Sequence, residues 1–141
     1  MREDLTKKMV NDIAFRIVGL AIEVHKTLGP GLLEDIYKDC LALELRNSGL
    51  FVQIEKKIEI VYKGVEIPRH YRQDLVVENC VIVEIKAQES FAPIHKAQLL
   101  TYMKLNNIPK GLLINFNVIN LTRDGLIPMV NELFKELNEG E

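Results

Sequence analysis

The sequence predicts a mixed α/β (α+β) fold in which helices flank a mixed central sheet. Two observations support this: the element order helix, helix, three strands, helix, strand and end helix, and an antiparallel meander followed by one strand-helix-strand crossover. The composition agrees, because 48% of the 141 residues are hydrophobic and 27% are charged, as in ordinary globular chains. We expect a single domain over residues 1–141, with a short acidic helix and tail at residues 128–141.

The first third of the chain has the periodicity of two helices. Between Leu5 and Leu28, apolar residues recur every three or four positions, which is typical of an amphipathic helix. Gly29-Pro30-Gly31 ends this helix, and a second helix is predicted from about Leu32 to Asn47. Apolar residues cover most of the circumference of the second helix, so the acid Glu34 within it calls for an explanation.

The middle of the chain has the alternating, β-branched pattern of strands. One strand is predicted from Val52 to Tyr62 and another from Val65 to Asp74. The second contains Pro68, which cannot donate a ladder hydrogen bond, so we expect an edge, a bulge or a break there. Residues 74–86 then predict a tight hairpin that turns at Glu78-Asn79-Cys80 and has a buried second strand.

The last third alternates between helix and strand. Ser90 is the predicted N-cap of a third helix, which has Pro93 in its first turn and ends near Asn106. Gly111–Asn117 is a predicted buried strand. From Pro128 onward, apolar residues at helical spacing predict the short amphipathic end helix.

Three ionisable residues, Asp74, Glu84 and Lys86, lie in or beside the most apolar part of the predicted sheet. Buried charges are costly unless they are paired or bind a metal ion. Glu84 and Lys86 are two residues apart on a strand, so they share a face. A two-residue hairpin loop would put Glu84 on the face opposite Asp74, whereas a three-residue loop would pair the two directly. Asn79 tolerates the left-handed backbone of the longer loop, which makes the co-facial register plausible, and both registers stay open.

If the carboxylates are co-facial, they and the lysine would form a hard-oxygen site that suits Mg²⁺ or Mn²⁺. The spacing Asp74-x9-Glu84-x-Lys86 resembles the signature of the PD-(D/E)XK nucleases. Gly31-Leu-Leu-Glu34-Asp-Ile-Tyr37 resembles the GxxExxY motif of a small prokaryotic branch of that superfamily, and Gln98-x3-Tyr102 resembles the QxxxY element of RecB-type nucleases. One departure is Gln73, which stands where the superfamily's name has proline.

The resemblance implies a restriction-endonuclease-like core, α-β-β-β-α-β, with an extra N-terminal helix. It also implies a divalent-metal-dependent nuclease that hydrolyses phosphodiester bonds, with DNA as the expected substrate and RNA left open. Lys86 would orient the attacking water or stabilise developing charge, and Gln98 would position Lys86 or that water. The implied catalytic residues are Asp74, Glu84, Lys86 and Gln98. The implied ligands of Mg²⁺ (or Mn²⁺) are Asp74, Glu84 and the backbone carbonyl of Ile85, and Glu34 would reach the same ion through water or bind a second ion. The expected nucleic-acid contacts are Arg72, His95, Lys96 and Tyr102.

Each assignment has a structural alternative. The Asp74/Glu84/Lys86 group could be an ion pair on a sheet face, and Glu34 could be a first-turn acid favoured by the helix dipole. Tyr37 is better explained by core packing than by chemistry, and His25 by solvation at a helix end than by ligation. The alternative function is a catalytically silent nuclease-fold module for binding or assembly. The intact carboxylate pair and lysine count against it.

The net charge of −2 argues against an indiscriminate polycation. Locally, however, the segment 56–72 holds five basic residues against two acids, which predicts weak, salt-sensitive contact with nucleic acid. Neither a signal peptide nor a membrane span is recognisable, so we expect a cytoplasmic protein without membrane contact. A small homodimer is expected, because one such core offers little surface for gripping a duplex.

Overall fold

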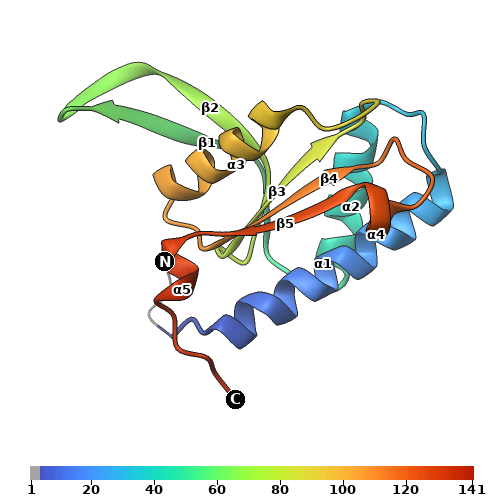
Figure 1. The fold of residues 1–141 in the computed structure, drawn as a ribbon, viewed down its shortest axis with the longest axis horizontal. Helices are drawn as coiled ribbons and strands as arrows, with labels where there is room; N and C mark the ends of the chain where they lie inside the picture. Colours follow the sequence, from blue (N-terminus) through green and yellow to red (C-terminus); the bar gives the residue numbers. More distant parts are fainter. Residues whose placement is uncertain (1–3) are drawn as a thin grey trace.

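The computed structural model describes residues 4–141, apart from the side chain of His70 (Figure 1). Within them the elements are α1 (Lys7–Leu28), α2 (Glu34–Asn47), β1 (Val52–Tyr62), β2 (Val65–Val77), β3 (Val81–Lys86), α3 (Pro93–Leu105), β4 (Lys110–Asn115), α4 (Leu121–Asp124), β5 (Leu126–Val130) and α5 (Glu132–Lys135). The predicted fold class is confirmed: α2 to β4 follow the order α-β-β-β-α-β, and α1 is the extra N-terminal helix.

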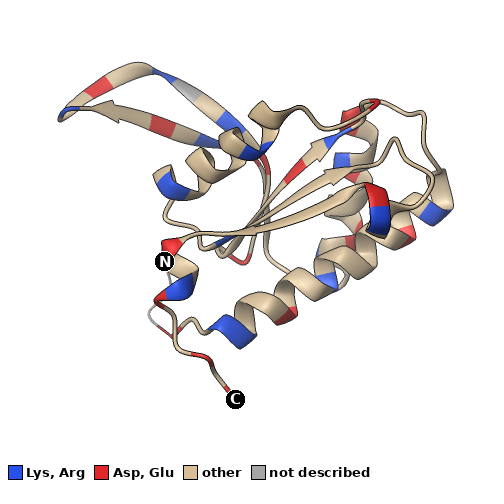
Figure 2. Ribbon diagram, viewed as in Figure 1, with Lys and Arg blue, Asp and Glu red and all other residues tan. Residues whose placement is uncertain are grey.

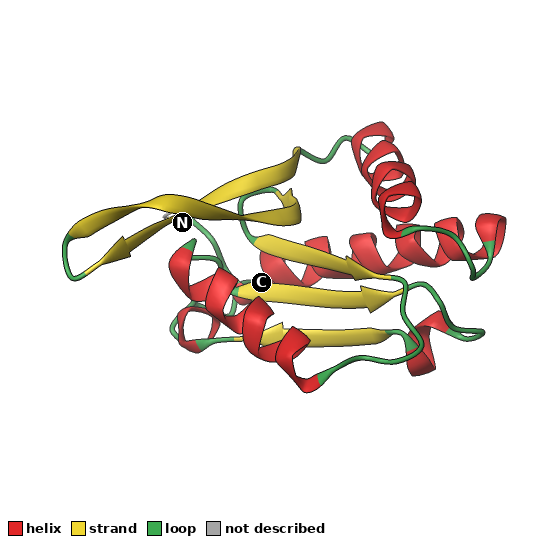
Figure 3. Cartoon of the chain, turned by 90° about the horizontal axis from the view of Figure 1, so that it is seen from above, coloured by secondary structure: helices red, strands yellow, loops and turns green. Residues whose placement is uncertain are grey.

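The sheet has the strand order β1-β2-β3-β4-β5 and separates two helical layers (Figure 3). Only β3 and β4 run parallel, and α3 connects them. Helices α1 and α2 pack on one face in a core that includes Leu75, Val83 and Ile85. Helix α3 packs on the other face against Val76 and Ile82. The alternation of side chains along β2 and β3 therefore decides which residues face α3.

The hairpin between β2 and β3 adopts the three-residue loop, Glu78 to Cys80. Val77 pairs with Val81 and Leu75 with Val83, so the register places Asp74 opposite Glu84. Both Glu78 and Asn79 have left-handed backbone angles, with φ of 51° and 53°. Of the two registers that the sequence allows, the structure thus has the co-facial one.

Strands β1 and β2 continue beyond β3 as a protruding two-stranded ribbon, residues 55–73 (Figure 1). The ladder shifts register between Glu59, which pairs with His70, and Ile60, which pairs with Ile67. Pro68 and Arg69 therefore lie outside regular pairing. Of the edge, bulge or break expected at Pro68, the structure has the bulge.

Two local predictions are wrong. The N-cap of α3 is Ala92 instead of Ser90, because Pro93 is the first helical residue and His95 Nδ1 accepts the Ala92 N–H at 3.1 Å. The end helix does not begin at Pro128, because this residue lies in β5 and pairs with Leu112 of β4. A proline is tolerated there because β5 is an edge strand, and only one helical turn, α5, follows.

Among the described residues, no helix is both long and apolar enough to cross a bilayer.

The end of β4 beside β3 depends on close packing at Gly125. Asn115, which pairs with Lys86, donates its N–H to the Gly125 carbonyl at 2.7 Å, and a Cβ on Gly125 would collide with the Asn115 carbonyl oxygen. We expect Gly125→Ala to lower the free energy of unfolding by about 1–3 kcal/mol, measured by urea titration. In Gly19→Ala, the control, the Cβ meets nothing within 4 Å, and the change should stabilise α1 by roughly 0.5–1 kcal/mol. Equal effects of the two changes would contradict this packing.

Candidate active site

Two carboxylates meet where β2 separates from β3. Glu84 projects from the sheet on the side of Ile82, which faces α3, and the Asp74 carboxylate reaches the Ile85 backbone across the gap. The Asp74 N–H donates to Glu84 Oε1 at 3.1 Å, and the Ile85 N–H donates to Asp74 Oδ2 at 2.8 Å. These bonds fix both side chains across the strands. The two carboxyl groups also share a side-chain hydrogen bond.

The pair is electrostatically strained. Glu84 is only 7% exposed, and burial together with the negative charge of Asp74 raises the Glu84 pKa to about 8. Burial also raises the pKa of Asp74 above its ordinary value. Lys86, on the same face of β3, offsets part of this repulsion and forms no ion pair within 4 Å among the described residues. Two like charges in a poorly hydrated site favour binding of a cation.

The backbone of Ile85 supplies a third oxygen. The Lys86 carbonyl accepts the Phe116 N–H at 3.0 Å, so that peptide points toward the end of β4. Backbone groups of successive strand residues point to opposite edges, so the Ile85 carbonyl points toward the gap left by β2, as its N–H does. A hard divalent ion could therefore be held by Asp74, Glu84, the Ile85 carbonyl and water.

Glu34 lies at the end of β3, where its Oε1 accepts the Ala87 N–H at 3.3 Å. Among the described residues, no three His, Cys, Asp or Glu side chains converge as a metal cluster. The structure therefore brings Asp74 and Glu84 together, and it places Glu34 next to the segment that follows Lys86. This position fits contact through water better than direct ligation.

Lys38 is a buried lysine that sequence reasoning missed. Its ammonium is held by Glu55 Oε1 at 2.7 Å and by Asp35 Oδ1 at 3.0 Å, and its positive charge offsets part of the rise in the Asp74 pKa that burial causes. Burial alone would lower the Lys38 pKa, but these two hydrogen bonds raise it above its ordinary value. The available signal was a lysine three residues after an acid on a helix whose apolar residues cover most of its circumference. Its partner Glu55 could not be identified from the sequence, because Glu55 lies on β1 at a position with a left-handed backbone angle, φ of 52°.

Helix α3 brings some of the predicted residues to the carboxylates. Burial and the negative charge of Glu84 raise the Tyr102 pKa to about 12, so the hydroxyl stays a hydrogen-bond donor. Burial and the charge of Lys86 lower the pKa of His95. Gln98 makes no hydrogen bond to Lys86 in the described part of the chain, and instead lines a groove with Tyr102. Lys96 is exposed and lies about 160° around the helix from Gln98.

Tyr37 has the predicted structural role. It is fully buried and stacks on Phe116, with ring centroids 4.5 Å apart. Its hydroxyl donates to the Gly29 carbonyl at 2.6 Å and accepts the Leu32 N–H at 3.1 Å, so it shapes the loop that positions Glu34. His25 is likewise structural, with Nε2 2.7 Å from the Val118 carbonyl oxygen.

The basic segment 56–72 forms most of the protruding ribbon (Figure 2). Arg72 lies 3.6 Å from Glu55 and thus belongs to the same charge network as Lys38. Gln73, the departure from the superfamily's name, is fully buried and accepts a hydrogen bond from Asn106 at 3.4 Å. The residue before Asp74 therefore packs inside the fold and leaves the carboxylate pair unaltered.

A helix-flanked mixed sheet with two facing carboxylates and a lysine on neighbouring strands has the arrangement of a metal-dependent nuclease centre. The family profile described as the PD-(D/E)XK nuclease superfamily matches residues 11–126, and the chain belongs to that superfamily. Its members are in general nucleases, which typically use divalent metals. Neither the curated proteins nor the solved structures contain a match to this chain.

The raised pKa of Glu84 predicts a pH-dependent stability. The unfolded chain ionises this group near 4.5 and the folded chain near 8, so its stabilising contribution is complete below about pH 4.5 and is lost as pH rises toward 8. Without metal, in EDTA, Glu84→Gln should change stability little at pH 5. At pH 8 it should be more stable than the wild type by on the order of a few kcal/mol, measured by urea denaturation. Glu89→Gln, at an exposed position, is the control. A Glu84→Gln effect that is the same at both pH values would contradict the burial of this charge.

Proposed function

We propose that the chain is a Mg²⁺- or Mn²⁺-dependent nuclease that hydrolyses phosphodiester bonds of DNA. The observation that carries this proposal is the pair of buried Glu84 and half-buried Asp74, which cross-strand hydrogen bonds hold opposite each other, with Lys86 on the same face of β3 as Glu84. A structural ion pair would need a cation in contact with the carboxylates. Lys86 is not within ion-pairing distance of any described acid.

The metal would be held by Asp74, Glu84 and the Ile85 carbonyl, and it would supply the Lewis acidity that phosphodiester hydrolysis requires. Lys38 favours the ionised form of Asp74, because its ammonium is fixed nearby by Asp35 and Glu55.

The remaining residues act on the substrate. The Lys86 ammonium would orient the attacking water or stabilise negative charge that develops on the phosphorus-bound oxygens. The Tyr102 hydroxyl, protonated at neutral pH, would donate to a phosphate oxygen. His95 accepts a backbone N–H with Nδ1, so the neutral ring would carry its proton on Nε2 as a further donor.

Contact with the phosphate backbone would come from the basic ribbon, including Arg72, and from Lys96. Because the charges are exposed, this contact would weaken as salt concentration rises. The GxxExxY motif would have a structural part in the site. Tyr37 holds the loop between α1 and α2, and Glu34 contacts the segment that follows Lys86.

Cleavage of single- and double-stranded DNA should require Mg²⁺ or Mn²⁺ and stop in EDTA. Lys86→Ala should lower the rate by about 10²–10³-fold while the circular dichroism spectrum is unchanged, because it removes charge stabilisation in the transition state. Asp74→Asn should abolish cleavage and weaken metal binding measured by calorimetry. Lys26→Ala, at an exposed position on α1, is the control and should cleave like the wild type.

A folded wild-type protein that binds no metal and cleaves neither DNA nor RNA would support the silent binding or assembly module instead. Cleavage that survives Asp74→Asn would show that the chemistry lies elsewhere.

A further inference from the structure

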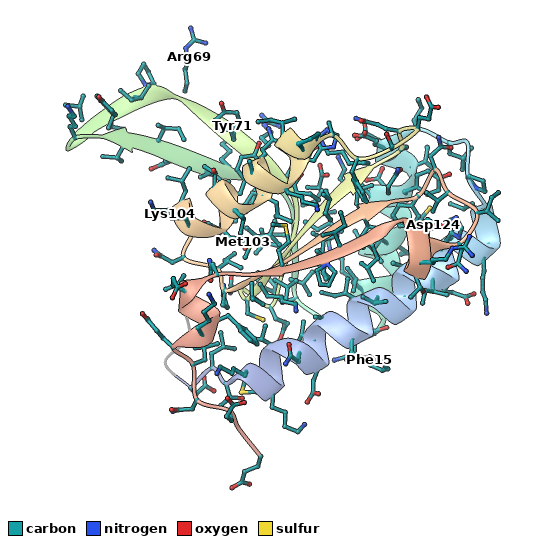
Figure 4. The ribbon with its side chains drawn as sticks, viewed as in Figure 1. Phe15, Arg69, Tyr71, Met103, Lys104 and Asp124 are labelled. Carbon is teal, nitrogen blue, oxygen red and sulfur yellow. The ribbon has the colours of Figure 1, made fainter. Side chains whose placement is uncertain are left out.

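A groove of about 230 Å³ lies between the ribbon and α3. Its lining residues are Tyr71, Ile94, Ala97, Gln98, Thr101 and Tyr102. Tyr71 lies between the ribbon and the helix, whereas Arg69, two residues away, projects into solvent (Figure 4). The ring of Tyr71 contacts that of Tyr102, with centroids 5.6 Å apart and planes tilted by 41°. Tyr71 is nevertheless 53% exposed, so much of its surface is open to solvent.

The groove lies near the carboxylate pair, because Tyr102 lines the groove and the charges of the pair reach it. Tyr102 forms its inner wall and is close enough to Glu84 and Asp74 for their charges to affect its hydroxyl. A part of the substrate that binds in the groove would therefore lie close to the phosphate under attack.

The chemistry of the walls indicates what that group is. Tyr71, Ile94 and Ala97 offer aromatic and aliphatic surface, which suits a flat apolar ring. Among the described residues, the Gln98 amide has no hydrogen-bond partner, so both its donors and its acceptor are available to a polar ring edge. The volume is below the roughly 300 Å³ at which pockets for drug-sized ligands begin, and it suits a single ring system.

We propose that this groove binds one unpaired nucleobase of the substrate, stacked on Tyr71 with its edge facing Gln98. The proposal rests on the proposed nuclease function and specifies its substrate class as single-stranded or locally unpaired nucleic acid. A base within a duplex is stacked and paired, and its extrusion opposes binding. A free strand presents its bases without that cost.

The test measures binding separately from cleavage. The full chain carrying Lys86→Ala is titrated in Mn²⁺ with a fluorescent 12-nucleotide single strand and with the matching duplex. We expect tighter binding of the single strand. Tyr71→Ala should weaken it by about 5- to 100-fold, the range for loss of one stacked base. Tyr71→Phe should keep the affinity. Tyr62→Ala removes an exposed tyrosine, 61% accessible, from the tip of the same ribbon and should have no such effect.

Single strands with an abasic site at each position in turn locate the bound base. At one position, loss of the base should weaken binding to the protein that keeps Tyr71. The same abasic strand should bind the Tyr71→Ala protein as tightly as the intact strand does, because the contact is already absent. Equal affinity for single strand and duplex, or a Tyr71→Ala protein that binds like its parent, would overturn the groove proposal. Absence of cleavage by the wild type would overturn the nuclease function alone, because the binding comparisons do not depend on hydrolysis.

Discussion

The structure depends on one constraint, which is that two carboxylates are held face to face across β2 and β3 where water is largely excluded. The three-residue loop at Glu78 sets the register, and the register decides the face. A shift by one residue would turn Glu84 into the apolar core shared with α1 and α2. It is equally necessary that β2 separates from β3 at Asp74. The Ile85 backbone then has no strand partner on that side, and the Asp74 carboxylate accepts the Ile85 N–H instead.

This constraint links stability to function. Repulsion and burial keep Glu84 protonated at neutral pH, so the metal-free fold carries an unfavourable interaction that a bound cation would relieve. The surrounding charges moderate this repulsion without removing it. Lys38 is tied to Asp35 and Glu55, and Lys86 remains outside ion-pairing distance. Both lysines therefore act over a distance, Lys86 on both carboxylates and Lys38 on Asp74.

The sequence allowed the core element order, the shared face of Glu84 and Lys86, and the bulge at Pro68 to be predicted, because each follows from local periodicity or backbone chemistry. It left the hairpin register open, since Asn79 is compatible with either loop. Lys38 was missed because Glu55, its partner, is brought close only by folding of the sheet onto α2. The predicted end helix includes residues 128–130, which belong to β5, because apolar residues around Pro128 fit both the helical and the strand period until β4 pairs with them. The groove at Tyr71 likewise forms only when the ribbon lies beside α3.

The central claim is that the buried pair binds a divalent cation and gives up a proton in doing so. Calorimetric titration of the wild type with Mn²⁺ at pH 7, in buffers of different ionisation enthalpy, counts the protons released. With a Glu84 pKa of about 8, binding should release close to one proton per ion, and release should fall at pH 9. Tight Mn²⁺ binding without proton release at pH 7, or no Mn²⁺ binding by the folded protein, would contradict this account.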